Sequence, residues 1–376
     1  MTKMQELANL GQSIWVDYIS RSFVESGELQ RMVDQGLRGV TSNPTIFEKA
    51  IAGSTVYNED LKRLVESGRT VEGIYEALVF KDILKAADIL LPVYEKTNCL
   101  DGFVSLEVNP NLAHDTVSTI KEARRLFAAL KRSNVMIKVP ATPAGIAAIK
   151  DLIGEGVNIN VTLIFSLEQY EAVAAAYIAG LEKLASSGGE VAKVGSVASF
   201  FISRVDTAVD EALEGVGHTD MQGKIAVDQA KIAYARFKEI FRGKKWERLA
   251  AKGGRVQRPL WASTSTKNPA YSDILYVENL IGANTVNTLP PATLEAFLDH
   301  GNMTTNLETD VEVAGSRIAK LDRLGIDLEA ITKQVLEDGV KSFAKSFDAL
   351  LESITEKRDK LLWDWQQLSA GFGSPS

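Results

Sequence analysis

Short apolar runs alternate with longer amphipathic stretches along most of the chain. The short runs are rich in β-branched and aromatic residues, which is typical of β-strands. Eight such runs can be identified: Ser13–Tyr18, Arg38–Asn43, Gly102–Val108, Val135–Pro140, Asn158–Leu163, Val194–Phe201, Pro259–Ser263 and Asn284–Leu289.

Between these runs, Ala, Leu, Glu and Lys recur at helical spacing. Examples are Glu28–Gln35, Thr116–Lys131, Ala144–Glu155, Leu167–Ser186, Asp206–Leu213 and Thr219–Phe241. Strands that alternate with helices imply a parallel sheet, and eight such units imply a closed (β/α)8 TIM barrel of the α/β class.

Two segments are longer than a minimal barrel needs. Phe47–Asn98 has room for two or three helices between the second and third strands, and Thr305–Leu368 is expected to form C-terminal helices. No Pro-, Gly- or Ser-rich linker divides the 376 residues, so we expect one domain over residues 1–376, with residues 305–368 as a C-terminal helical extension. The final GFGSPS is expected to fray.

Alternation along each strand separates an apolar face from a polar one, because successive side chains point to opposite sides. In the fourth run, Val135, Ile137 and Val139 share one face, while Met136 and Lys138 share the other. The apolar face can pack on the surrounding helices. The polar face must then point into the barrel, where branched apolar side chains are the usual filling.

Several of these inward polar residues come late in their strands. They are Asp17, Asn43, Glu107, Lys138 and Thr162. The late end of each strand is the C-terminal mouth of the barrel, where barrel enzymes build their active sites. Taken alone, a lysine in an apolar run fits an edge strand, and an asparagine before a proline fits a helix cap. Their convergence favours a functional site.

The residue types indicate a particular chemistry. Apolar surroundings disfavour the charged form of a lysine amine, and the neutral amine of Lys138 can attack a carbonyl to form a Schiff base. The iminium nitrogen then accepts electrons while a carbon–carbon bond breaks or forms. Asp17 and Glu107 are candidate proton carriers. Thr162 can position a water with Glu107, and Asn43 and Asn160 can hold substrate hydroxyls.

Composition narrows the functional class. The net charge of −7 argues against a nucleic-acid partner, and the single cysteine excludes an intrachain disulfide and fits a reducing, cytoplasmic setting. The N-terminus lacks the apolar core of a signal peptide, and no run approaches the length of a membrane span. The three histidines are scattered without ligand spacing, so we expect no metal.

Four segments together resemble the signature segments of transaldolase, in particular its longer bacterial form within the class I aldolase superfamily. They are GVTSNPTIFEKAI (Gly39–Ile51), VSLEVNP (Val104–Pro110), VMIKVPATPAGIAAI (Val135–Ile149) and NINVTLIFSLEQY (Asn158–Tyr170). The similarity extends from the first strand to about Pro291. It implies a (β/α)8 barrel that needs no cofactor or metal.

The resemblance also implies a reaction. A dihydroxyacetone unit moves from sedoheptulose 7-phosphate to glyceraldehyde 3-phosphate, giving erythrose 4-phosphate and fructose 6-phosphate, in the non-oxidative pentose phosphate pathway. Lys138 matches the Schiff-base lysine, Asp17 the acid/base of the carbon–carbon step, and Glu107 with Thr162 the pair that orders a catalytic water.

Substrate-binding positions follow from the same resemblance. Asn43 and Asn160 match residues for substrate hydroxyls and the intermediate, and Thr41 lies beside Asn43. A second set matches the family's contacts to substrate and phosphate: Ser199, Phe201 and Arg204 in SFFISR, and Ser263 in WASTSTKNP. Shorter family members carry an arginine two positions after that serine. This chain has Ser265 there, with Lys267 as a candidate for the missing charge.

Two other functions stay open at this stage. A fructose 6-phosphate aldolase-like lyase would share the lysine, but its known counterpart has glutamine and tyrosine where Glu107 and Phe201 stand, which favours transfer. A catalytically silent barrel that only binds sugar phosphates would not need the acid/base residues.

The sequence does not decide between a monomer and a homodimer. Two side features are expected to be structural: a basic surface turn at Arg242–Arg258, and core packing of the aromatic pair in LLWDWQQL.

Overall fold

The eight predicted strands are all present and pair, each with its neighbours along the chain, in a closed parallel barrel ordered β1 to β8. The computed structural model describes residues 1–371. The strands are β1 (Gln12–Asp17), β2 (Gly39–Thr41), β3 (Phe103–Glu107), β4 (Val135–Pro140), β5 (Ile159–Ile164), β6 (Ser196–Phe201), β7 (Arg258–Ala262) and β8 (Thr285–Leu289). The expected (β/α)8 TIM barrel is therefore confirmed.

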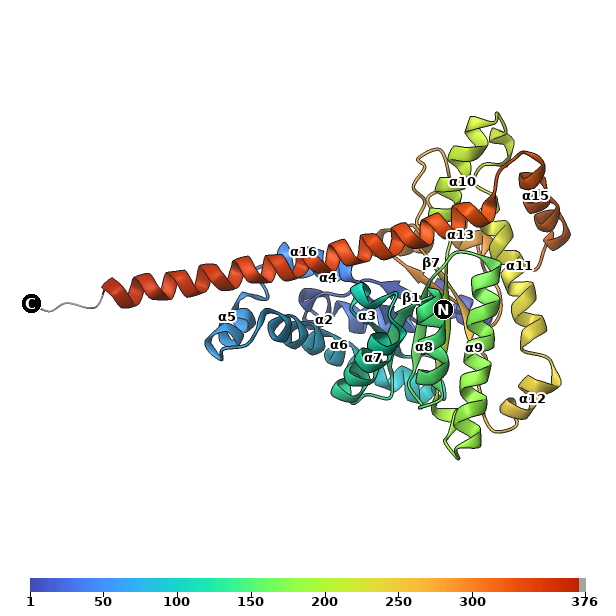
Figure 1. Ribbon diagram of the computed structural model, residues 1–376. Helices are drawn as coiled ribbons and strands as arrows, with labels where there is room; N and C mark the ends of the chain where they lie inside the picture. The colour runs from blue at the N-terminus through green and yellow to red at the C-terminus, as the bar shows by residue number, and fades with distance from the viewer. Residues whose placement is uncertain (372–376) are drawn as a thin grey trace, which may run out of the picture.

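Helices surround this barrel (Figure 1). The α-helices are α1 (Lys3–Asn9), α2 (Arg21–Glu25), α3 (Glu28–Asp34), α4 (Pro44–Ala52), α5 (Asn58–Glu66), α6 (Val71–Lys96), α7 (Thr116–Leu130), α8 (Pro143–Ile153), α9 (Leu167–Ser186), α10 (Ser203–Gly215), α11 (Ile225–Ile240), α12 (Lys244–Ala250), α13 (Leu275–Asn279), α14 (Pro291–His300), α15 (Val311–Arg323) and α16 (Leu328–Gly371). Three short 3-10 turns complete the set: η1 (Pro110–Leu112), η2 (Val191–Lys193) and η3 (Thr219–Met221).

Capping residues explain where several of these helices begin. Asn43 and Thr142 each accept a backbone hydrogen bond from the first turn, and each is followed by a proline, which suits the first helical position. Ser166 forms a capping box with Gln169 at the start of α9. The helices therefore start immediately after β2, β4 and β5, which fixes the loops at the C-terminal mouth.

One of the expected helices differs in detail. The predicted helix Thr219–Phe241 is wrong at its start: η3 is followed by Gly223 with φ +70°, and α11 begins only at Ile225. A positive φ interrupts an α-helix and suits glycine. The insertion after β2 contains α4, α5 and α6, and the C-terminal region contains α15 and α16, as expected. Apart from Gly371, the GFGSPS tail lies outside the described residues.

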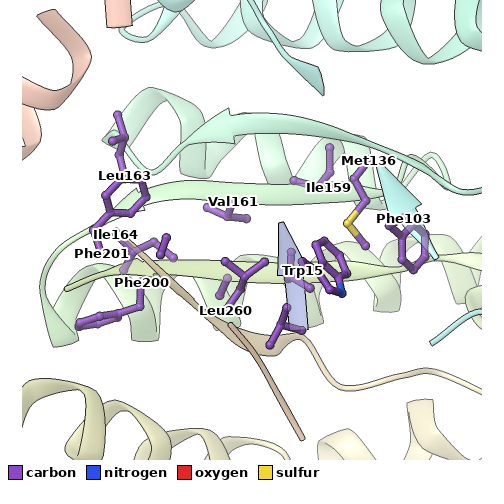
Figure 2. Close-up of a cluster of buried hydrophobic side chains, with 14 of the residues drawn as sticks. Trp15, Phe103, Met136, Ile159, Val161, Leu163, Ile164, Phe200, Phe201 and Leu260 are labelled. Atoms are coloured by element: carbon purple, nitrogen blue, oxygen red, sulfur yellow. The ribbon is translucent and has the colours of Figure 1, made fainter. Parts of the chain in front are cut away.

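The alternation within β5 breaks at Leu163. Its φ is +59°, and the register to β6 shifts between Val161 and Ile164. Simple alternation places Leu163 on the outer face with Val161, but its side chain instead lies beside Gly339 of α16. Figure 2 shows Leu163 near Phe201 at one end of the buried cluster, while Trp15 and Phe103 lie at the other end.

A buried polar network closes the N-terminal end of the barrel. Arg258, the first residue of β7, donates hydrogen bonds to Asp101 (2.8 Å) and to Ser13 (2.9 Å). Asp101 also accepts bonds from Ser13 and from the Trp15 indole. Arg258 is 3% exposed, so the expected surface turn at Arg242–Arg258 is wrong at its end, where the chain enters the barrel wall.

Helix α16 crosses the opposite, C-terminal end of the barrel and then extends beyond it (Figure 1). Gly339 permits the close approach, because a Cβ there would lie 3.2 Å from Leu163 Cδ2 and 3.3 Å from an Arg204 nitrogen. Farther along, Trp363 is 60% exposed, so the expected core packing of LLWDWQQL is wrong for this residue. Within residues 1–371, no helix combines the length and apolarity needed to cross a bilayer.

Candidate active site

Strand register places Lys138 between two other predicted residues. It is the register partner of Glu107 on β3 and of Asn160 on β5, so the three side chains leave the sheet on the same face at the same level. Lys138 is 4% exposed, and its Nζ donates a hydrogen bond of 3.1 Å to the carbonyl of Ser42. Its Nζ also lies 3.6 Å from Glu107 Oε2. The amine is thus fixed from two sides.

Glu107 is a buried carboxyl group, 7% exposed. Burial raises the pKa of Glu107 to about 7, with Lys138 opposing the shift and Asp17 adding to it. Its Oε2 has no hydrogen-bond partner among the described residues. A carboxyl group with a pKa near neutrality can accept and return a proton under physiological conditions.

Asp17 lies at the end of β1 and is oriented by Thr41. The Thr41 hydroxyl donates a 2.6 Å hydrogen bond to Asp17 Oδ1 and also lies 2.7 Å from the hydroxyl of Thr288. Burial raises the pKa of Asp17, while the charge of Lys138 and the Thr41 bond lower it. Thr41 therefore positions the carboxyl group, besides lining the space in front of it.

A polar chain crosses the barrel interior from β3 through β5 to β6. Asn160 donates to Ser105 Oγ (3.0 Å) and accepts from Ser199 Oγ (2.7 Å), which fixes the amide orientation. Thr162, two residues beyond Asn160 on β5, is fully buried, and its hydroxyl oxygen has no hydrogen-bond partner within the described part of the chain.

A cavity of about 370 Å³ opens at the C-terminal mouth, a size that suits a sugar phosphate. Nine of the predicted site residues line it: Asp17, Thr41, Asn43, Lys138, Ser199, Phe201, Arg204, Ser263 and Lys267. Asn43 combines both of its possible roles, since it caps α4 and also lines the cavity. Glu107, Asn160 and Thr162 are close by but do not line it.

Arg204 is held by two aromatic rings. Its guanidinium carbon lies 5.6 Å from the ring centroid of Phe201 and 5.6 Å from that of Phe343 on α16. Burial lowers the pKa of Arg204, against the raising influence of Glu107 and Asp17. Its cation is therefore positioned by stacking at the wall of the cavity, where it can bind an anion.

Lysine and serine side chains lie near Arg204 on the loop after β7. Lys267 Nζ donates a 2.6 Å hydrogen bond to Ser265 Oγ, and Ser263 Oγ lies 2.8 Å from Ser203 Oγ. Partial desolvation at the rim of the cavity lowers the pKa of Lys267, and the positive charges of Arg204 and Lys49 lower it further. Lys267 thus shares this end of the cavity with other cations, and Ser265 lines it as well.

Lys49, Thr288 and Phe343 are among the lining residues that sequence reasoning missed. Lys49 could have been found from helical spacing, because it lies one turn after Thr45 on the helix that begins beside Asn43. Phe343 could not, since nothing local indicates that a distant C-terminal helix covers the barrel. Its ring centroid lies 5.8 Å from Lys138 Nζ.

The lining of the cavity is cationic although the chain is acidic. Its charged members are Lys49, Lys138, Arg204 and Lys267 against Asp17. Such a site attracts a small phosphorylated substrate. A buried amine beside two proton carriers can form and hydrolyse an imine. Among residues 1–371, no group of three His, Cys, Asp or Glu side chains is placed to hold a metal ion.

Comparison with known proteins agrees with this chemistry. The family model described as Transaldolase/Fructose-6-phosphate aldolase matches residues 14–354. A protein named Transaldolase from Trichodesmium erythraeum is 49% identical over 372 residues, which cover 95% of this chain and 97% of the relative. Another named Transaldolase from Thiobacillus denitrificans is 48% identical over 358 residues, covering 94% and 100%. Transaldolase 2 from Nostoc punctiforme is 47% identical over 367 residues, covering 94% and 96%.

Proposed function

The chain belongs to the transaldolase/fructose-6-phosphate aldolase family, and from this premise we propose that it is a transferase that moves a dihydroxyacetone unit between sugar phosphates through a Schiff base on Lys138. The observation that supports this proposal is the position of the buried Lys138 amine. Its Nζ lies 3.6 Å from Glu107 Oε2, and Lys138 lines a cavity together with Asp17 and Arg204. The reaction converts sedoheptulose 7-phosphate and glyceraldehyde 3-phosphate to erythrose 4-phosphate and fructose 6-phosphate, a step of the non-oxidative pentose phosphate pathway.

The first half-reaction begins when the amine of Lys138 adds to the ketose carbonyl. The carbinolamine loses one water and becomes a protonated imine. Asp17, held by Thr41, takes the proton from the hydroxyl at the carbon beyond the bond to be broken. That carbon–carbon bond then cleaves, its electron pair moves toward the imine nitrogen, and an aldose phosphate leaves. An enamine of dihydroxyacetone stays on Lys138.

The second half-reaction reverses these steps with a new aldehyde. The enamine carbon attacks the acceptor carbonyl, and Asp17 returns its proton to the new hydroxyl. Water then adds to the imine carbon while Glu107 accepts the proton of that water, and the Thr162 hydroxyl holds the same water. Expulsion of the amine releases the product ketose. Asn43 and Asn160 hold the hydroxyls of the bound fragment, and the Asn160 amide is oriented by Ser199 and Ser105.

The phosphate of either substrate binds at the cationic end of the cavity. Arg204 supplies a planar guanidinium that can form two parallel hydrogen bonds to phosphate oxygens. Lys267 and Ser263 complete the site from the loop after β7, and Phe201 packs against the Arg204 guanidinium. This assignment explains why a chain with a net charge of −7 can bind anionic substrates.

The partners that this function requires are sugar phosphates. No nucleic-acid partner is proposed, because the overall charge is negative. A cytoplasmic location is also part of the proposal, and the single cysteine supports it. The reaction as written needs no cofactor, because the lysine imine itself serves as the electron acceptor.

A transfer assay tests the assignment. The purified chain is incubated with fructose 6-phosphate, with and without erythrose 4-phosphate, and glyceraldehyde 3-phosphate and sedoheptulose 7-phosphate are measured. Continuous product formation only in the presence of the acceptor is expected for a transferase. Free dihydroxyacetone released without an acceptor would instead indicate a lyase. Borohydride reduction with fructose 6-phosphate should attach a fragment to Lys138, and absence of this adduct would support a silent barrel.

A further inference from the structure

A second cavity, of about 250 Å³, approaches Glu107 from a different side of the barrel mouth. Glu72 of α6 and Arg125 of α7 line it and are exposed to solvent, whereas Glu107 is 7% exposed. The cavity therefore extends from the surface to the buried residue Glu107. Glu107 lines this cavity and not the one that contains Lys138.

Helix α16 separates the two cavities. Phe343 lines the first and Phe347 lines the second, and residues four apart lie on the same face of a helix. Both rings are buried, and Tyr75 of α6 packs edge-on against Phe347 with ring centroids 5.3 Å apart. The wall between the cavities is thus aromatic, and a sugar bound on one side does not fill the other.

The two cavities also differ in charge. Besides Glu107, the second is lined by Glu72, Glu76 and Glu122, with Arg125 as its only cation in the described chain. Arg125 bridges Glu76 and Glu122 and thereby links α6 to α7. An anionic sugar phosphate is repelled from such a lining, while water is not. At ~30 Å³ per molecule in the liquid, several waters fit in this volume.

We propose that this second cavity is the route by which water and its protons reach Glu107 and the imine on Lys138, separate from the sugar entrance. The proposal rests on the proposed function. Imine formation releases one water and imine hydrolysis consumes one, and at both moments the ketose occupies the first cavity. In hydrolysis the water oxygen becomes the carbonyl oxygen of the product, Glu107 takes one of its protons, and the carbon–nitrogen bond to Lys138 breaks.

Unused hydrogen-bonding capacity lies at the inner end of this route. Glu107 Oε2 and Thr162 Oγ1 are both buried, and neither has a hydrogen-bond partner among the described residues. A buried hydroxyl is costly to leave unpaired, and a water that reaches either atom would supply a hydrogen-bond partner. Glu107 Oε2 also lies 3.6 Å from Lys138 Nζ, so such a water would be close to the imine.

Narrowing the cavity without touching the first one tests the route. Leu112 on η1 and Phe80 on α6 line the second cavity from different elements, and each can be replaced by tryptophan. The control is Leu362→Trp on the exposed part of α16, where the native side chain is 39% exposed. Each variant is incubated with fructose 6-phosphate in ¹⁸O-labelled water. The enzyme-catalysed rate of label entry at the ketose carbonyl is measured, and the adduct on Lys138 is trapped with borohydride at equilibrium.

The expected result is a kinetic effect alone. Leu112→Trp and Phe80→Trp should each slow ¹⁸O entry at least about fivefold, while the trapped fraction at equilibrium and the KM for fructose 6-phosphate change less than about twofold. Leu362→Trp should match the unaltered protein. If one tryptophan variant does not fold, the other still decides the outcome.

Two negative outcomes are distinguishable. Label entry at the unaltered rate in both folded tryptophan variants, with the adduct present on Lys138, would overturn the water route and leave the transferase assignment standing. An unaltered protein that shows neither the adduct nor catalysed label entry would overturn the proposed function, and the water route with it.

Discussion

Glu107 Oε2 lies 3.6 Å from Lys138 Nζ, yet the two side chains line different cavities. The pair sits on adjacent strands at the same register level, so their closeness follows directly from the pairing of β3 with β4. The amine is presented to the sugar and the carboxyl group to the other side of α16. In the proposed mechanism, this division supplies substrate to the nucleophile Lys138 and water to the base Glu107 from separate cavities.

Replacing Lys138 by alanine should abolish transfer while leaving the barrel folded. The amine is the proposed nucleophile, and loss of a covalent nucleophile commonly lowers kcat by about 10⁴-fold or more. Activity is measured in the transfer assay, and folding by circular dichroism and thermal unfolding. Lys138→Arg is the matched control, because it keeps a cation near Glu107 but cannot form the imine. Transfer at even a tenth of the original rate in either variant would refute the assignment.

Replacing Glu107 by glutamine should change the pH dependence as well as the rate. Burial raises the pKa of Glu107 to about 7, so the group gains its charge, and its function as a base, only as the pH rises through this range. We therefore expect kcat of the unaltered protein to fall below about pH 7. Glu107→Gln should lower kcat by roughly 10²- to 10⁴-fold and remove this acidic limb. Borohydride should trap more adduct at steady state, because hydrolysis of the imine becomes slow.

An acidic limb that survives unchanged in Glu107→Gln would assign the titration to another group. Asp17 is the alternative, since burial raises its pKa as well. The corresponding variant, Asp17→Asn, should stop the carbon–carbon step but still permit catalysed entry of ¹⁸O at the ketose carbonyl. The roles of the two carboxyl groups can therefore be distinguished by the step that each variant loses: the carbon–carbon step for Asp17, and ¹⁸O entry at the ketose carbonyl for Glu107.

Replacing Arg204 by alanine should weaken the use of phosphorylated sugars selectively. A charge-assisted hydrogen bond is worth about 1.5–3 kcal/mol, so kcat/KM for fructose 6-phosphate should fall about 10- to 100-fold. For unphosphorylated fructose we expect less than a threefold loss by the same reasoning. Lys267→Met should show the same selectivity with a smaller effect, because its side chain is exposed at the rim. Equal losses with both sugars would contradict a phosphate role.

The barrel and nine residues that line its cavity could be predicted from sequence because the information is local. The composition of each strand predicts it, and the alternation of side chains along β3 and β4 places Glu107 and Lys138 on the face that points into the barrel. Alternation fails at Leu163, where a positive φ turns the side chain toward α16. It also gives no sign of Phe343, which stands more than 200 residues after Lys138 in sequence but covers it in space.

The two cavities could not be predicted for the same reason. Their separation depends on how α16 docks across the barrel mouth, with Gly339 allowing close contact at Arg204. A helical pattern in the sequence predicts that a helix exists, but not which surface it covers. The cationic end of the cavity lies between these cases: Arg204 was recognisable from its motif, while Lys49 could have been found only from its helical spacing after Thr45 on α4.

Asp206, outside the proposed catalytic set, should make stability depend on pH. Burial raises the pKa of Asp206 to about 7, well above the ordinary 3.8, so the folded protein keeps this proton between those values while the unfolded chain releases it. The contribution is complete below about pH 4 and is lost as the pH rises toward 7. Asp206→Asn should therefore raise the free energy of unfolding at pH 8 by on the order of 3 kcal/mol, with little change at pH 4.

Urea unfolding of both proteins at the two pH values measures this difference. The asparagine oxygen can still accept the 2.7 Å hydrogen bond from the Ala226 amide, so the start of α11 is preserved. Transfer activity should stay within about twofold, because Asp206 does not line the substrate cavity. A variant that is less stable than the unaltered protein at pH 8 would contradict the raised pKa.

The buried ion pair between Arg258 and Asp101 lies at the N-terminal end of the barrel, so it should affect stability but not catalysis. Arg258 and Asp101 are 3% and 4% exposed, and their hydrogen bonds also engage Ser13 and Trp15. Arg258→Met leaves the Asp101 carboxylate buried without its cation, which should cost about 3–5 kcal/mol of unfolding free energy in urea titrations at pH 7. The double variant Arg258→Met with Asp101→Leu removes both charges, and should recover most of that loss. Since both residues lie at the N-terminal end, kcat should be unchanged at temperatures where each variant is folded. Destabilisation in the double variant as large as in the single one would mean that packing and hydrogen bonds, rather than the unpaired charge, account for the loss.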